Sequence, residues 1–154
     1  MNIRPTERRD IPALTSVLDA TELFPSALLP EMLDGFLGGG ASDDIWLTVE
    51  QKGDAIGFCY AAPEALAEGT WNMLAIAVHP DAQGGGAGSA LVAELERRLR
   101  ADGQRILIAD TSGTDDFADT RRFYAQNGYS EEARIRDFWA AGDDKVVFWK
   151  SLPA

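Results

Sequence analysis

A glycine-rich turn halfway along the chain has the residue types and spacing to hold a phosphate group. Residues 79–89 are His-Pro-Asp-Ala-Gln-Gly-Gly-Gly-Ala-Gly-Ser, and they follow a continuously apolar run at 73–78. After the turn, apolar residues recur at helical spacing from Ala87 to Leu99. Because glycine has no Cβ, such a turn can aim backbone N–H groups at an anion beside the positive end of the next helix. The sequence therefore predicts a buried strand covered on both faces, a phosphate-binding loop and a helix, in that order.

Three families of glycine loop compete for this turn. A P-loop needs a lysine to reach the outer phosphates, and no lysine lies between Lys52 and Lys145, which excludes it. A dinucleotide fingerprint would place Ser89 where a third glycine or alanine belongs, and would follow the first strand of the chain. A nucleotide- or dinucleotide-binding enzyme is therefore the weaker interpretation. The third pattern, Q/R-x-x-G-x-G/A, has Gln83, Gly86 and Gly88 in its named positions.

A second motif, Phe-Tyr-Ala-Gln-Asn-Gly-Tyr, stands at residues 123–129. One helix and one strand are expected between the two motifs. In this order and at this distance, the motifs resemble those of the GCN5-related N-acetyltransferase (GNAT) superfamily, and the resemblance spans most of the chain. It implies an α/β (α+β) fold with a mixed, mostly antiparallel sheet of about six to seven strands and helices on both faces.

The resemblance also implies an activity and its co-substrate. The chain is expected to be an N-acetyltransferase that moves an acetyl group from acetyl-CoA to a primary amine of a small molecule or peptide, by direct attack in a ternary complex. The pantetheine arm would run along the backbone of residues 76–78, and the pyrophosphate would lie on the glycine loop. The residues expected to bind the coenzyme are Ile76, Ala77, Val78, Gln83, Gly84, Gly85, Gly86, Ala87, Gly88, Ser89, Phe123 and Tyr124.

Tyr124 matches the tyrosine that protonates the departing thiolate in many members of the family. A phenol with a pKa of about 10 can still donate to a thiolate with a pKa of about 8.5 that is held beside it. The alternative is that Tyr124 only anchors the end of its helix. Relatives often carry an asparagine some seven residues earlier, where this chain has Phe117. That contact with the pantetheine is therefore in doubt.

The general base is less clear. Many relatives carry a glutamate on the strand before the loop, where this chain has Trp71, Asn72 and Met73, none of which can take a proton. Asp110, at the end of the next strand, is the preferred substitute and would act through water, with Glu22 as the second candidate. Both carboxylates could instead only cap a turn or face solvent, and an amine that binds in its neutral form needs no base. The missing glutamate leaves open a non-catalytic acyl-CoA-binding sensor or regulatory domain on the same fold.

Composition limits the partners. The 154 residues, 45% of them hydrophobic, suffice for one domain spanning 1–154. The net charge of −11 argues against nucleic acid and anionic membranes as partners, and mildly favours a cationic acceptor, although solubility alone would explain it.

The lone Cys59 and His79 cannot supply ordinary zinc spacing, so no metal is expected. The absence of an apolar leader and of a membrane-length apolar run predicts a cytoplasmic protein, and a homodimer is left open.

The elements that would position these residues follow from periodicity and turn residues. The acceptor pocket is expected between residues 22–25 and a terminal hairpin that includes Trp139. Arginines at 97, 98, 121 and 122 are candidate cations near the coenzyme. Helices are predicted at 9–21, 26–37, 86–102 and up to about 127; strands are predicted at 3–5, 45–50, 55–61, 70–78, 105–110, 133–139 and 145–152.

Overall fold

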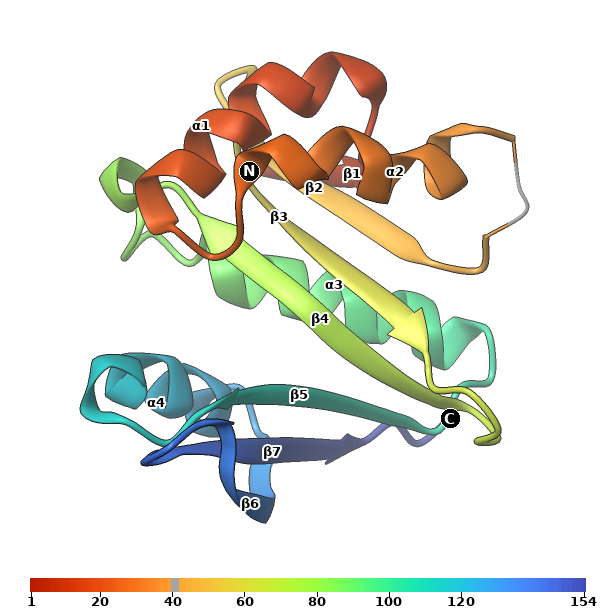
Figure 1. Ribbon diagram of the computed structural model, residues 1–154. Coiled ribbons are helices and arrows are strands. Elements are labelled where there is room, and N and C mark those ends of the chain that lie inside the picture. The colour runs from red at the N-terminus through yellow and green to blue at the C-terminus, as the bar shows by residue number, and fades with distance from the viewer. Residues whose placement is uncertain (40–41) are drawn as a thin grey trace. The chain divides into compact units, whose positions relative to one another are not determined.

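The computed structural model describes residues 1–39 and 42–154 (Figure 1). The chain divides into two compact units, one of Met1–Ala62 with Leu74–Arg97 and the other of Pro63–Met73 with Arg98–Ala154. The expected single domain over residues 1–154 stays a prediction.

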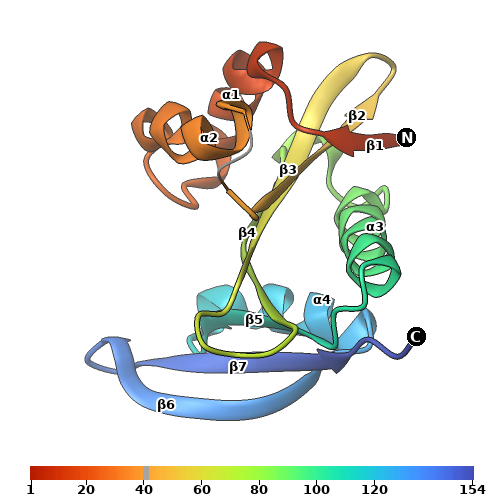
Figure 2. The same cartoon turned by 90° about the vertical axis from the view of Figure 1, so that its right-hand side faces the viewer.

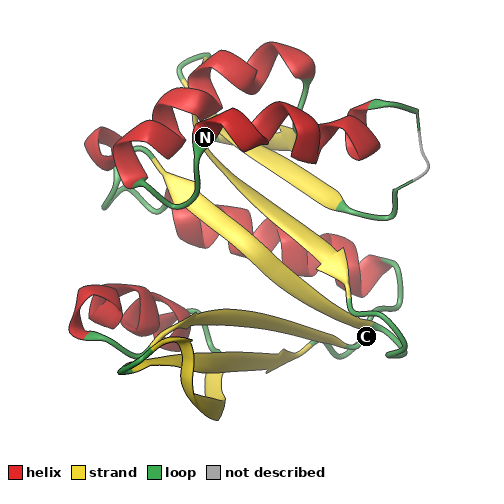
Figure 3. Ribbon diagram, viewed as in Figure 1, coloured by secondary structure: helices red, strands yellow, loops and turns green. Residues whose placement is uncertain are grey.

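Helices and strands follow one another in the expected order (Figure 3). The strands join in the order β1-β2-β3-β4-β5-β7-β6, and β4 pairs with β5 in parallel from Thr70 opposite Ile106 to Asn72 opposite Ile108. The pairs β1–β2, β2–β3, β5–β7 and β6–β7 are antiparallel, which confirms the predicted mixed, mostly antiparallel sheet. The elements are β1 (Asn2–Pro5), α1 (Ile11–Thr21), α2 (Leu29–Leu37), β2 (Ile45–Gln51), β3 (Asp54–Pro63), β4 (Thr70–Val78), α3 (Ala87–Ala101), β5 (Ile106–Ser112), α4 (Ala118–Gln126), β6 (Ser130–Ala140) and β7 (Asp143–Ser151).

In the first unit, helices cover both faces of the strands. Figure 2 shows α1 and α2 on one side of β2 and β3, and α3 on the opposite side. A core of fully or nearly buried side chains forms beneath α1 and α2, where Trp46 stacks on Phe58 with ring centroids 5.7 Å apart. The turn between β2 and β3 consists of Lys52 and Gly53, both with positive φ, as a tight hairpin turn requires. The apolar positions that predicted α3, namely Ala87, Leu91, Leu95 and Leu99, are all buried.

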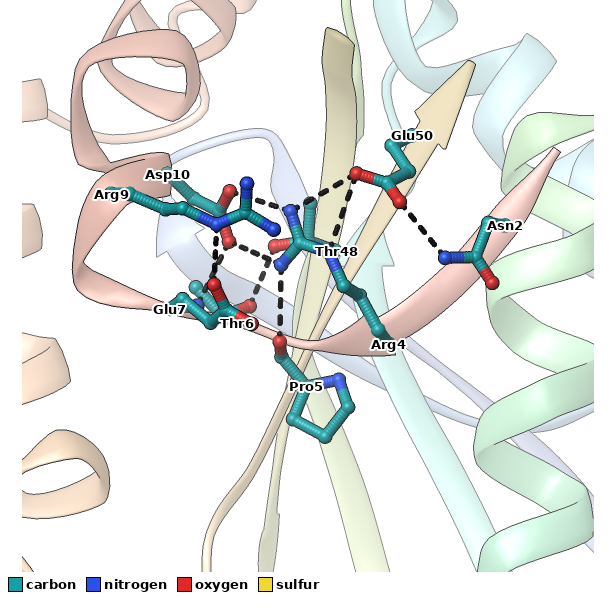
Figure 4. A network of polar contacts seen from close by, with 9 residues as sticks. All are labelled: Asn2, Arg4, Pro5, Thr6, Glu7, Arg9, Asp10, Thr48 and Glu50. Carbon is teal, nitrogen blue, oxygen red and sulfur yellow. Dashed lines mark hydrogen bonds and ion pairs between the residues drawn. The ribbon is translucent and has the colours of Figure 1, made fainter. Parts of the chain in front are cut away.

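A polar network ties β1 to β2 and to the start of α1 (Figure 4). The guanidinium of Arg4 donates to both carboxylate oxygens of Asp10 at 2.8 Å and to Glu50 at 3.2 and 3.3 Å. Burial alone would raise the pKa of Asp10, but the hydrogen bonds from Arg4 and from the Glu7 N–H outweigh it and lower that pKa. The hydrogen bonds to Asp10 and Glu50 raise the pKa of Arg4, against the effect of its own burial. This network stabilises the entry of the chain into the sheet.

In the second unit, α4 packs on β7 through aromatic rings. Tyr124 lies 5.3 Å from Phe148 and 5.9 Å from Tyr129, measured between ring centroids, and is 4% exposed. All eleven residues of β6 are exposed, although β6 pairs with β7 from Ser130 to Ile135 and again at Ala140. In the part of the chain that the structure describes, no helix has the length and apolarity to cross a membrane.

Candidate active site

The end of β4 presents main-chain groups on the edge away from β3. The N–H of His79 donates to the Ile56 carbonyl oxygen of β3 at 2.8 Å. Because successive residues of a strand direct their N–H and C=O groups to alternate sides, those of Ile76 and Val78 point away from β3. The recorded pairing of β4 with β5 covers Thr70 to Asn72 and does not reach them. The binding of a coenzyme through these groups of Ile76 and Val78 stays a prediction.

One expectation about this strand is wrong. The apolar run at 73–78 predicted a strand covered on both faces, but the side chain of Leu74 is 53% exposed and Ile76 is only partly buried. Ala75 and Ala77 are buried in the core under α1 and α2. Alternation of side chains places Leu74 and Ile76 on the opposite face, which is therefore only partly covered. An uninterrupted apolar run cannot distinguish a covered face from one that is left open.

The glycine loop has the backbone that its sequence predicts. Gly84 and Gly86 have φ of +84° and +87°, whereas Gly85 has an ordinary φ. A Cβ built on Gly84 would meet no atom within 4 Å, and one on Gly86 would meet only the Met1 Cε at 4.0 Å. These glycines are therefore required by backbone conformation rather than by crowding within the chain. Helix α3 begins at once with Ala87, and its first-turn N–H groups have no helix carbonyl to bind.

Two side chains hold the strand-to-loop connection. The Nε2 of Gln83 donates to the Val78 carbonyl oxygen at 3.0 Å, so Gln83 fixes the loop against the end of β4. The Nδ1 of His79 accepts from the Asp81 N–H at 3.2 Å and caps the short helical turn Pro80–Ala82. The single histidine thus holds the turn that leads into the loop, and Gln83 occupies one of the two acceptor sites of the Val78 carbonyl.

The four candidate arginines already have interactions within the chain. Arg97 pairs with Glu94 at 2.7 Å, Arg122 pairs with Asp119 at 2.6 Å, and Arg121 donates to two loop carbonyls at 2.7 and 2.8 Å. Recognition of an anion by this loop would therefore depend mainly on backbone N–H groups and on the dipole of α3.

Asp110 lies in a polar cluster within the second unit. Its Oδ2 is 3.4 Å from the Lys145 ammonium and accepts from the Asn72 Nδ2 at 3.3 Å. The same Nδ2 of Asn72 donates to the Glu64 Oε1 at 2.9 Å. The Lys145 ammonium also lies over the Phe138 ring, 4.4 Å from its centroid. Among the described residues, the buried Oδ1 atoms of Asn72 and Asp110 have no hydrogen-bond partner.

The structure thus brings Asp110 together with three residues that sequence reasoning gave no role: Glu64, Asn72 and Lys145. Asn72 was visible as a polar residue inside an apolar strand, among the three residues that stand where many relatives were expected to carry a glutamate. No signal pointed to Lys145, because its contact with Asp110 depends on the pairing of β5 with β7. Next to this cluster, Phe138 and Trp139 are each 49% exposed, and the Trp139 indole donates to the Thr111 carbonyl at 3.2 Å.

The other predicted residues are distributed over both units. Glu22, in the first unit, ends α1 with a left-handed backbone and lines a pocket of about 510 Å³ with residues that include Phe24 and Pro25. Tyr124 and Phe123 belong to the second unit, where Tyr124 has the packing expected of a helix anchor. The catalytic roles of Tyr124, Asp110 and Glu22, and an acceptor pocket that includes residues 22–25 and the hairpin, stay predictions.

Comparison with known proteins decides the family. The model of the Acetyltransferase (GNAT) family matches residues 13–129, which include both the glycine loop and the Tyr124 motif. The chain belongs to this family. It is a GNAT acetyltransferase, as its two motifs predicted. A search of curated proteins found no match.

Solved structures agree with the GNAT assignment. A protein from Desulfovibrio desulfuricans, assigned to the GNAT family, is 32% identical with a TM-score of 0.90, and the match covers 98% of each chain. The ribosomal-protein-S18-alanine N-acetyltransferase of Escherichia coli is 20% identical with a TM-score of 0.79, over 99% of this chain and 94% of that one. An aminoglycoside 6′-N-acetyltransferase complexed with coenzyme A is 18% identical with a TM-score of 0.81, over 100% and 98%. The last two show a shared fold, and none of the three favours a sensor domain.

Across residues 1–39 and 42–154, no group of three or more histidine, cysteine, aspartate or glutamate side chains is arranged to hold a metal ion. Cys59 is buried in β3, within the core of the first unit.

Proposed function

We propose that this GNAT protein transfers the acetyl group of acetyl-CoA to a primary amine of a small molecule or peptide. The observation that carries the proposal is the conformation of the glycine loop, with two left-handed glycines between the open edge of β4 and the start of α3. Backbone N–H groups of residues 84–89 bind the pyrophosphate, and the groups of Ile76 and Val78 bind the pantetheine arm. The coenzyme A in an aminoglycoside acetyltransferase of the same fold supports this choice of co-substrate.

The reaction is a direct attack in a ternary complex. The acceptor reaches the site as an ammonium ion and loses one proton to Asp110, directly or through water. Its nitrogen then attacks the thioester carbonyl carbon, a C–N bond forms, and the C–S bond breaks. Tyr124 donates a proton to the departing thiolate, and the proton released by the new amide nitrogen restores Tyr124. The sum is R–NH₃⁺ plus acetyl-CoA giving R–NH–acetyl, coenzyme A and one proton.

Thiol release from acetyl-CoA tests this proposal on a panel of polyamines, amino acids, aminoglycosides and N-terminal peptides. Amine-dependent thiol release, with an acetylated product of the correct mass, is the expected result. Tight acetyl-CoA binding without turnover on any amine would favour the sensor domain instead. A cytoplasmic location belongs to the same proposal, and sedimentation of the purified chain distinguishes a monomer from the homodimer that the sequence left open.

A further inference from the structure

We propose that Asp110, Asn72 and Phe138 form an ammonium-binding site, which Lys145 fills in the free protein and which the primary ammonium group of the acceptor takes over. The inference rests on the proposed function, because it names the acceptor class of the same reaction as an alkylammonium ion. All four residues lie in the second unit.

Lys145 shows that the site accepts an ammonium group. Its Nζ is 3.4 Å from a carboxylate oxygen of Asp110 and lies over the Phe138 ring, 4.4 Å from the ring centroid. A carboxylate beside an aromatic face is the combination that attracts an alkylammonium ion through both its charge and its N–H donors. The 3.4 Å contact is long for a charge-assisted hydrogen bond, so Lys145 is held loosely. Its four-carbon stem is flexible, and its side chain is 21% exposed, so it can leave the site.

Around Asn72, acceptor oxygens of the site lack hydrogen-bond donors. Its amide orientation is fixed, because a reversed amide would place an oxygen against the carboxylates of Glu64 and Asp110. The Oδ1 of Asn72 therefore stays an acceptor in a side chain that is only 7% exposed, and it has no partner among the described residues. The Oδ1 of Asp110 is also buried and also has no hydrogen-bond partner among the described residues. A primary ammonium group brings three donors, which equals in number these two oxygens and Asp110 Oδ2.

The local charge also favours a cation. Glu64 and Asp110 both contact the Asn72 amide, and Lys145 is the cation that the structure places on Asp110. When Lys145 leaves, two carboxylates and an unpartnered amide oxygen remain for the incoming group. A neutral alcohol of the same shape can donate one hydrogen bond here but has no charge to attract the carboxylates. The site therefore selects an alkylammonium acceptor over its neutral isostere.

The test is an equilibrium titration followed by NMR, without coenzyme, so that no acetyl transfer can take place. The probe is n-butylammonium, and n-butanol is the neutral control of similar shape. We expect the parent protein to bind n-butylammonium in preference to n-butanol. Lys145→Met should tighten n-butylammonium binding about fivefold or more, because the competing ammonium is gone. Lys52→Met removes the same charge from the exposed turn between β2 and β3 and should change the affinity less than twofold.

Two further variants examine the site itself. Phe138→Leu should weaken n-butylammonium about threefold through loss of the cation–π contact, and Asn72→Leu should weaken it more. The inference is overturned if n-butanol binds as well as n-butylammonium, or if Lys145→Met and Lys52→Met have equal effects. If Lys145→Met does not fold, Lys145→Gln and the ammonium-to-alcohol comparison on the parent protein decide the question. A parent that transfers acetyl groups but shows no ammonium preference would refute this site alone.

Discussion

Alanine substitutions along the glycine loop distinguish the free-energy cost of a left-handed backbone from the cost of steric contact by an added Cβ. Gly84 and Gly86 have φ of +84° and +87°, and Gly85 does not have a positive φ. A left-handed backbone costs a residue with a Cβ about 1–2 kcal/mol. A Cβ on Gly85 would meet only the Ala82 carbonyl oxygen at 3.8 Å, which is an ordinary contact. Gly85→Ala is therefore a matched control with the same added methyl group and no conformational strain.

The strain in Gly84→Ala or Gly86→Ala can appear in either of two quantities. If the loop keeps its conformation, the free energy of unfolding falls by about 1–2 kcal/mol. If the loop relaxes to another conformation, the free energy of unfolding is unchanged. The acetyl-CoA affinity then falls roughly 5- to 30-fold, because binding must restore the left-handed conformation. Urea unfolding and calorimetric titration with acetyl-CoA, made on the same samples, measure both quantities. The reasoning fails if both variants keep parental stability and affinity, or if Gly85→Ala loses as much as they do.

Three other predictions concern single side chains. Tyr124→Phe should lower the rate of thiol release while leaving acetyl-CoA affinity nearly intact, and a parental rate across neutral pH would leave Tyr124 only its packing role. Asp10→Asn should cost about 3 kcal/mol of unfolding free energy at neutral pH, because it breaks the paired, buried carboxylate in Figure 4. Since the pKa of Asp10 is lowered in the folded protein, this stabilisation is present above the unfolded pKa of about 3.9 and is lost as the pH falls through the lower folded value. Urea unfolding between pH 2 and 7 should show that the difference in unfolding free energy between Asp10→Asn and the parent vanishes in acid. A difference that is independent of pH would contradict this prediction. An equal loss in Asp54→Asn, the control at an exposed position, would also contradict it. Burial, and to a smaller extent the hydrogen bond to Asp44, raise the pKa of Tyr60 to about 12. Absorbance at 295 nm should therefore show a late phenol ionisation that Asp44→Asn moves to lower pH, and an unchanged titration would count against that contact.

Local signals in the sequence predicted most of the elements. The strand at 70–78 has the predicted bounds, and α3 begins one residue after its predicted start. Pro12 lies in the first turn of α1, where a proline is tolerated, and the residues before it form a short 3₁₀ turn instead of the predicted helix start. These features depend on neighbours within a few residues, which a single sequence displays.

The candidate site was predictable only where it is built from consecutive residues. The glycine loop is such a segment, so its conformation followed from its composition. The Asp110 cluster is different, because Asn72 and Lys145 reach Asp110 across 38 and 35 positions of the chain through strand pairing. The exposure of Leu74 depends in the same way on what packs over its face. Long-range pairing leaves little local trace in one sequence, which is why the contacts of the predicted base required the structure.

The most direct test of the central claim is a calorimetric titration of acetyl-CoA into the parent protein and into Gly86→Glu. The added carboxylate would enter a loop that has open space at this position and is expected to hold a pyrophosphate, so it brings both strain and like charge. We predict clear binding by the parent protein, and loss of binding by a folded Gly86→Glu variant. Unchanged acetyl-CoA affinity in that variant, or tighter binding of NAD than of acetyl-CoA by the parent protein, would contradict the assignment of this loop to coenzyme A.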